Sequence, residues 1–214
     1  MANTPLSITV GVLACVFLVA QSGCKGFDQK LLEGKKTVHQ IYPCMTTRFE
    51  TTGKQMPVWF YNDSDAILQG SFPENCSKGE KPHGTLLVQY LDRDRSVGAG
   101  YAWFIPSLLT LTIINFFGVP AASQNATTDL QVIVQEPNNR EIARYSGRGD
   151  NTEYTAYYWG YPALGALNLN IYNDIARAAN AGAVLQAIEQ VHAQIQQDEA
   201  RLRAGLGWAK SHAP

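Results

Sequence analysis

The chain has 214 residues, of which 45% are hydrophobic and 16% are charged, and its formal net charge is -1. These values describe an ordinary globular chain of one or two domains and argue against disorder. Lys35 and Lys36 are adjacent, and the sequence has no larger cluster of Lys and Arg. Because nucleic-acid binding depends on a basic surface that neutralises phosphates, the composition excludes nucleic acid as an expected partner.

The N-terminal region contains a predominantly apolar run over residues 8–20. Its length is typical of a signal peptide, because a membrane-spanning helix needs about 20 apolar residues. The run is followed by Gln-Ser-Gly-Cys at residues 21–24. This sequence resembles a bacterial lipobox, in which the signal is cut off on the N-terminal side of a cysteine and the cysteine is acylated. Gln21 stands where a lipobox usually has a Leu-like residue. An ordinary cleaved signal and an uncleaved N-terminal anchor therefore stay open as alternatives.

The lipobox resemblance implies a signal peptide at residues 1–23, a lipid such as palmitate on Cys24, and a polar tether at residues 24–36. Each buried methylene of an acyl chain contributes about 0.8 kcal/mol, and several chains together give stable anchoring. Lys25 follows the cysteine in place of Asp, which by resemblance to enteric sorting favours the outer membrane. The expected location is the cell envelope, with the protein anchored by lipid on the periplasmic side or the surface.

Residues 37–214 are expected to form a single domain whose first half consists of strands joined by loops. β-branched and aromatic content predicts the strands, and turn-forming residues predict the loops. The candidate strands are residues 38–42, 56–61 and 85–91, and the candidate loops are residues 62–65 and 73–84.

Cys44 and Cys76 are the cysteines that follow the lipobox. An even pair in a protein exported from the cytosol predicts a disulfide. A zinc site formed by these cysteines with His39 and His83 is the alternative. Its spacings lack the close Cys-x2-Cys pairing of common structural zinc sites, so the disulfide is preferred.

Residues 96–128 contain no Asp, Glu, Lys or Arg, and the most apolar part of this stretch is residues 101–120. Proline and glycine at its ends predict a helix over residues 106–117, although alternating Leu and Thr also permit a strand. Twelve helical residues reach about 18 Å, which is short of the roughly 30 Å apolar core of a bilayer. The segment is therefore predicted to be a core element or to contact lipid or a partner protein without spanning. The residues assigned to that contact are Trp103, Phe104, Leu108, Leu109, Leu111, Ile113, Ile114, Phe116 and Phe117.

A β-hairpin is predicted from strands at residues 129–136 and 140–146 with a Pro-Asn-Asn turn between them. Residues 146–150 are predicted to be a flexible loop. The Arg-Gly-Asp sequence within that loop has the composition of an adhesion motif, but three residues are a weak signal, and a plain turn is preferred.

Aromatic residues gather before the last region of the chain, where they either pack against a sheet or form a ligand platform for sugar or lipid. They are Tyr154, Tyr157, Tyr158, Trp159 and Tyr161. Pro162 predicts the first turn of a helix that runs to about residue 179.

The strongest helical signal covers residues 181–204, where one stripe recurs at spacings of three and four. Its members are Val184, Ile188, Val191, Ile195, Asp198 and Leu202, with Gln, Glu and Arg on the opposite face. Because the stripe is short for an independent coiled coil, we expect it to pack on the domain's own sheet.

The sequence lacks a nucleophile-elbow motif, a Walker loop, a His-Glu-x-x-His motif and a dinucleotide glycine fingerprint. No catalytic residue, metal or cofactor is predicted, and no oligomeric state. The expected fold is α+β, or mixed α/β, with an antiparallel-rich sheet and C-terminal helices packed on it.

The expected function is a non-enzymatic assembly, scaffold or interaction module, with membrane lipid and another envelope protein as partners. One alternative is a small envelope hydrolase or ligand-binding protein that uses residues 154–161. The other is a membrane protein that spans at both apolar segments.

Overall fold

The structure is a computed structural model that describes residues 28–33, 44–52, 58–74, 76, 79–94, 109, 113, 120, 122–156, 161–162 and 169–206. The chain divides into two compact units, one formed by residues 1–27, 96–125 and 152–178 and the other by residues 28–95, 126–151 and 179–214. Most described residues belong to the second unit. The expectation of a single domain over residues 37–214 stays a prediction.

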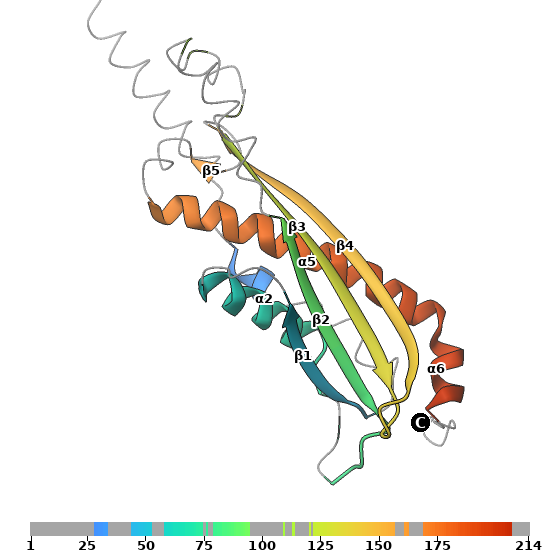
Figure 1. The fold of residues 1–214 in the computed structure, drawn as a ribbon. Coiled ribbons are helices and arrows are strands. Elements are labelled where there is room, and N and C mark those ends of the chain that lie inside the picture. The colour runs from blue at the N-terminus through green and yellow to red at the C-terminus, as the bar shows by residue number, and fades with distance from the viewer. Residues whose placement is uncertain are drawn as a thin grey trace, which may run out of the picture. The chain divides into compact units, whose positions relative to one another are not determined.

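The elements form one mixed sheet with helices (Figure 1). The strands are ordered β1-β2-β3-β4-β5 in the sheet, with β1 and β2 parallel, β2 and β3 antiparallel, and β4 and β5 parallel. The α+β class predicted from the sequence is confirmed. In chain order the elements are η1 (Gln29–Glu33, a 3-10 helix), β1 (Thr46–Thr52), α2 (Val58–Ser71), β2 (Thr85–Asp94), β3 (Ala122–Gln135), β4 (Glu141–Ala156), β5 (Tyr161–Pro162), α5 (Leu169–Gln197) and α6 (Glu199–Gly205).

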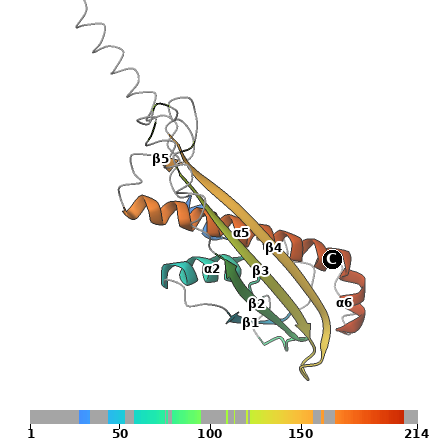
Figure 2. The ribbon, with the colours of Figure 1, turned by 45° about the horizontal axis from the view of Figure 1, so that its top comes forward.

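The core of the second unit lies between one face of the sheet and the helices. Alternate residues of β2 and β3 are buried there, which matches the period of two expected for strands with one covered face. The predicted stripe of α5 and α6 packs on this face, as expected, and the views in Figures 1 and 2 both show α5 running along β3 and β4. The principal buried residues are Leu86, Val88, Tyr90, Leu130, Val132, Val134, Tyr145, Val184, Ile188, Val191, Ile195 and Leu202.

The strand predicted at residues 56–61 and the loop predicted at residues 62–65 are wrong, because α2 runs through both. The buried residues of α2, together with Phe72 just after it, recur at helical spacing. They are Asp63, Ser64, Ile67, Leu68, Ser71 and Phe72. Since half of this buried face is polar, the hydrophobic pattern alone did not reveal the helix.

The predicted hairpin is confirmed, but both strands are longer than predicted, and residues 146–150 belong to β4 rather than to a loop. Glycine at positions 147 and 149 allows β4 to approach α5 very closely. A Cβ at Gly149 would lie 1.7 Å from the carbonyl oxygen of Ala183, and one at Gly147 would lie 2.1 Å from that of Ala187. These glycines are therefore packing residues in a continuous strand.

The helix predicted from Pro162 begins later, since Pro162 lies in β5 and α5 starts at Leu169. The C-terminal helical region is confirmed with a break at Asp198, which separates α5 from α6. The residue that interrupts the apolar stripe is thus the one at which the helix is broken. The strand predicted at residues 38–42 lies outside the described residues, whereas the one at residues 85–91 is confirmed as part of β2.

The predicted disulfide joins Cys44, just before β1, to Cys76, in the loop between α2 and β2. Bonded sulfur atoms are not available as thiolate ligands, so the alternative zinc site is overturned. The backbone of the same loop is also fixed to the strand, because the N–H of His83 donates to the carbonyl of Cys44 at 2.8 Å.

Gly149→Ala should lower the free energy of unfolding by about 1 to 3 kcal/mol, because the new methyl group forces β4 away from the backbone of α5. Ser146→Ala is the matched control, since that side chain is exposed on the same strand. Urea unfolding curves measure both changes. Equal stability of the two variants would contradict the close approach.

Replacing both cysteines, Cys44→Ser with Cys76→Ser, should lower the free energy of unfolding by roughly 3 to 4 kcal/mol. The disulfide closes a loop with a sequence separation of 32, and the estimate is the loop entropy that the unfolded chain regains. Unfolding of the oxidised protein and of the double variant gives the difference. The unreduced wild type should also yield a linked peptide pair in mass spectrometry.

Candidate functional site at the sheet edges and the solvent face

The outer edge of β4 is closed by glutamine side chains from α5. The backbone N–H groups of Ser146, Arg148 and Asp150 donate to the side-chain oxygens of Gln194, Gln190 and Gln186 at 3.3, 3.0 and 3.1 Å. Two of the glutamines also act as donors. The side-chain amides of Gln190 and Gln194 donate to the backbone carbonyls of Arg148 and Ser146 at 2.7 Å each. We call this arrangement the glutamine ladder.

The glutamine ladder fits because the two elements have nearly the same repeat. Four residues of an α-helix rise about 6.0 Å, while two residues of a strand extend about 6.6 to 6.8 Å. A side chain at every fourth helical position therefore stays close to every second strand position over a few repeats. The sequence analysis placed these glutamines on the face opposite the apolar stripe, and it did not foresee this role.

The closure of the edge continues beyond the ladder at the junction of α5 and α6. Arg201 donates to the carbonyl of Ile142 at 3.3 Å, and the Tyr145 hydroxyl donates to the carboxylate of Asp198 at 2.9 Å. Burial is the main cause that raises the pKa of Tyr145 above its ordinary value, and the bond to Asp198 adds to it. The Tyr145 hydroxyl therefore remains a donor over the physiological pH range.

The other face of the sheet carries polar side chains that bond across the strands. Gln89 donates to Glu50 at 3.1 Å, Arg144 donates to Gln131 at 3.3 Å, and Thr127 donates to Asp150 at 3.3 Å. A pocket of about 380 Å³ lies at this hairpin, and its lining residues are Asp129, Leu130, Gln131, Ser146, Gly147, Arg148 and Gln190. The cross-strand hydrogen bonds hold these polar side chains in fixed positions on the outer face of the sheet.

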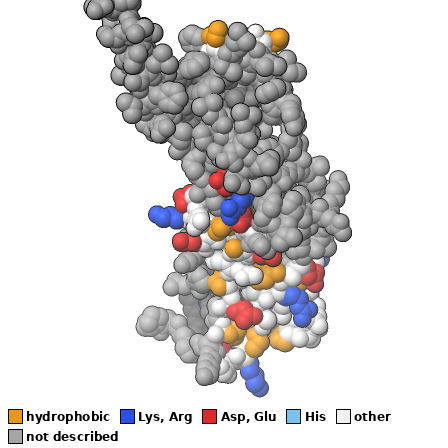
Figure 3. All heavy atoms as spheres, turned by 90° about the vertical axis from the view of Figure 1, so that its left-hand side faces the viewer, with side chains coloured by type: hydrophobic (Ala, Val, Ile, Leu, Met, Phe, Trp, Pro, Cys, Tyr) orange, Lys and Arg blue, Asp and Glu red, His pale blue; other side chains and the backbone are white. Residues whose placement is uncertain are grey.

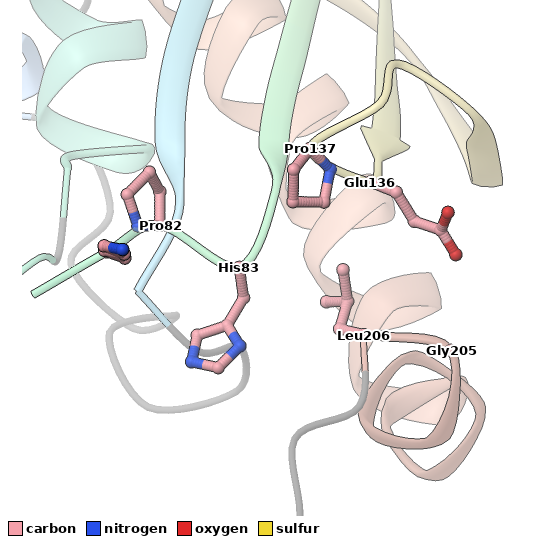
Figure 4. Close-up of a pocket in the computed structure, with 7 residues that line it drawn as sticks. Pro82, His83, Glu136, Pro137, Gly205 and Leu206 are labelled. Atoms are coloured by element: carbon pink, nitrogen blue, oxygen red, sulfur yellow. The ribbon is translucent and has the colours of Figure 1, made fainter.

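A second pocket of about 410 Å³ lies near the disulfide loop and the end of α6 (Figure 4). The side chains of His83 and Glu136 point apart in that view, with Pro137 and Leu206 between them. Arg140 donates to Glu136 at 3.0 Å and holds the pKa of that carboxyl below its usual range. The Glu136 carboxylate is therefore held as an ion-pair partner and does not face the imidazole as a catalytic partner.

A buried polar network connects four elements of the second unit, and sequence reasoning missed it. Asn180 donates to Ser64 at 3.0 Å, and the Tyr90 hydroxyl lies 3.5 Å from the side-chain oxygens of both Asn180 and Thr128. Each of these residues is at most 2% exposed. Satisfied buried polar groups fix the alignment of the elements that carry them, so this network is structural.

Most of the residues singled out from the sequence as a site lie outside the described part of the chain. Cys24 is among them, as are Trp103, Phe104, Leu108, Leu111, Ile114, Phe116, Phe117, Tyr157, Tyr158 and Trp159. Their assigned roles stay predictions.

The remaining residues of these predicted sites are described at least in part. Leu109 and Ile113 are helical and exposed, at 79% and 56%. Tyr154 is 36% exposed near the end of β4, and the backbone of Tyr161 lies in β5.

No described helix combines the length and apolar character needed to cross a membrane. The described ranges also contain no group of three or more His, Cys, Asp or Glu side chains placed to hold a metal ion.

Comparison with known proteins gives a distant structural likeness and no sequence relative. No protein-family model and no curated protein matches the chain. Among solved structures, the chain is similar to a candidate lipoprotein from Caulobacter crescentus CB15, with 13% identity and a TM-score of 0.30 over 75% of this chain and 92% of that one. A TM-score this low does not establish a shared fold.

Gln190→Ala should destabilise the protein by about 1 kcal/mol, because the strand loses two hydrogen bonds and water replaces part of them. Gln196→Ala is the matched control, since it lies on the same helix with an exposed side chain. Both changes bring the same gain in helix propensity. Unfolding in urea measures the difference, and an equal effect of the two variants would contradict the ladder.

Proposed function

We propose that the protein is a lipid-anchored envelope protein that acts as a non-enzymatic interaction module at a membrane surface. The observation that carries the membrane contact is the exposure of Leu109 and Ile113, at 79% and 56%. Both residues are helical and four positions apart in the sequence, which is the spacing of side chains that share one face of an α-helix. Large apolar side chains exposed together are typical of contact with lipid or a partner.

The anchor rests on the sequence at residues 21–24, which resembles a lipobox ending in Cys24. The disulfide between Cys44 and Cys76 supports an exported location, because disulfides form and persist mainly outside the cytosol. Lys25 after the acylated cysteine favours the outer membrane as the final location. The anchor would attach the chain to the membrane, and Leu109 and Ile113 would add an apolar contact.

The contacts of the described polar side chains support the proposed interaction role. Gln190, Glu136 and Asp198 are each engaged in a structural bond to the strand, the turn or a buried tyrosine. The solvent face of the sheet offers a surface of cross-bonded polar groups. Such a surface is suited to recognition by another protein.

Cys24→Ala should abolish incorporation of a fatty-acid analogue while the protein keeps its fold, because the anchor precedes the described core. Metabolic labelling followed by in-gel detection measures the first effect, and thermal unfolding measures the second. Cys15→Ala, within the apolar run, is the control and should leave the labelling unchanged. Unchanged labelling of the Cys24 variant would refute the lipid anchor.

Leu109→Asp with Ile113→Asp should weaken binding to lipid vesicles more than tenfold when both are placed in a Cys24→Ala protein that lacks the signal peptide at residues 1–23. Burying each side chain contributes about 1.5 to 3 kcal/mol, and about 1.4 kcal/mol corresponds to a factor of ten. Ala66→Asp with Gln69→Asp adds the same charge on exposed positions of α2 and serves as the control. Vesicle co-sedimentation compares the two, and equal binding would rule out the proposed contact.

A further inference from the structure

The two ends of the sheet differ in the second unit, since β4 is closed by the glutamine ladder and β1 is the terminal strand at the other end of the strand order. Figure 1 shows β1 outside β2, on the side of the sheet away from β4. No strand among the described residues pairs with the outer side of β1. An edge of this kind is a template for pairing with another strand.

The hydrogen bonds to β2 reveal which backbone groups of β1 point outward. The N–H of Thr46 donates to the carbonyl of Gly84 at 3.1 Å, and the carbonyl of Cys44 accepts from His83 at 2.8 Å. In a parallel pair the two groups of one residue point the same way, and alternate residues point to opposite sides. The even-numbered residues therefore bond to β2, and Thr47, Phe49 and Thr51 direct their N–H and C=O groups outward.

The sequence of β1, Thr-Thr-Arg-Phe-Glu-Thr-Thr, is symmetric about Phe49. Reversing it exchanges threonines with threonines and exchanges Arg48 with Glu50, which carry opposite charges. When this strand pairs antiparallel with a copy of itself about Phe49, each threonine lies opposite a threonine and Phe49 lies opposite Phe49. Arg48 then lies opposite Glu50, which carries the opposite charge.

We propose that β1 pairs antiparallel with β1 of a second copy of this chain, about a two-fold axis at Phe49. Phe49 would then face Phe49 of the second copy, and Thr47 would face Thr51 in both directions. These are the residues with outward backbone groups, so each facing pair exchanges both bonds and about six inter-chain backbone hydrogen bonds form. The same surface is used by both copies, as in the commonest class of protein dimer.

The charged residues support this register because Arg48 and Glu50 occupy the positions between the hydrogen-bonded pairs. Facing residues at such positions have Cα atoms about 4.5 Å apart, which is the closest side-chain approach in an antiparallel pair. Both side chains are exposed, and they lie on the face of the sheet opposite Phe49, which packs against the core. Two reciprocal Arg–Glu pairs would therefore flank the axis.

The same charges disfavour the neighbouring registers. A shift of two residues in one direction places Arg48 opposite Arg48 of the second copy, and a shift in the other direction places Glu50 opposite Glu50. Like charges that face each other across strands are destabilising. Figure 3, which views this side of the molecule, shows acidic and basic side chains interspersed among the described atoms.

The test measures the molar mass of the full-length protein in detergent by light scattering over a range of concentrations. Wild type should form a dimer. Arg48→Glu and Glu50→Arg should each raise the dimer dissociation constant tenfold or more, because each places like charges opposite each other. Arg144→Glu, which changes an exposed arginine on β4, is the matched control and should leave the dissociation constant unchanged.

The combined variant with Arg48→Glu and Glu50→Arg should dimerise as wild type does, because the exchange restores both pairs. A mixture of the two single variants should also form a heterodimer, since one contributes two glutamates and the other two arginines. Recovery in either experiment excludes misfolding as the cause of the loss. A monomer at all concentrations, single variants that dimerise normally, or failure of both recoveries would overturn the proposal.

Discussion

The hydrogen bonds between the glutamine ladder and the backbone of β4 are the constraint on which the second unit depends. A strand at the edge of a sheet exposes backbone groups that must be solvated, covered or paired. Here Gln186, Gln190 and Gln194 meet those groups at alternate strand positions. The ladder fixes the distance between helix and strand, and Gly147 and Gly149 make that distance possible because no side chain separates the two backbones.

The ladder also explains why the sequence predicted some elements and missed others. The hairpin and the C-terminal stripe were predictable, because their apolar residues recur at strand and helix spacings. Residues 146–150 read as a loop because they are polar and rich in glycine. They continue the strand that pairs with β3, and glutamines 36 to 48 positions later in the chain bond to their outer edge. Local patterns do not contain that information.

The sequence did not predict the helix α2, for a related reason. Its buried face includes Asp63, Ser64 and Ser71, so its hydrophobic pattern is weak. Ser64 is buried because Asn180 of α5 bonds to it, and Asn180 in turn lies within bonding distance of Tyr90. The aromatic residues at the start of α2 favoured a strand locally, and tertiary contacts override that preference. The disulfide was predictable because two inferences suffice for it: the two cysteines form an even pair, and an exported protein folds in an oxidising compartment.

Because the glutamine ladder closes one edge of the sheet, the proposed strand pairing would be confined to the other edge. The glutamine ladder covers β4, while β1 carries a self-complementary sequence around Phe49. An anchored protein with one closed edge and one self-complementary edge would present its polar sheet face in a defined orientation. Assembly and membrane attachment would then use separate parts of the chain.

Residue-resolved hydrogen exchange tests the closed edge most directly. The amides of Ser146, Arg148 and Asp150 should exchange as slowly as those of the central strand, such as Val132, although they point away from β3. Protection must come from the glutamines, since no strand covers that part of the described sheet. Exchange of these amides as fast as that of Asn138 in the turn would contradict the account.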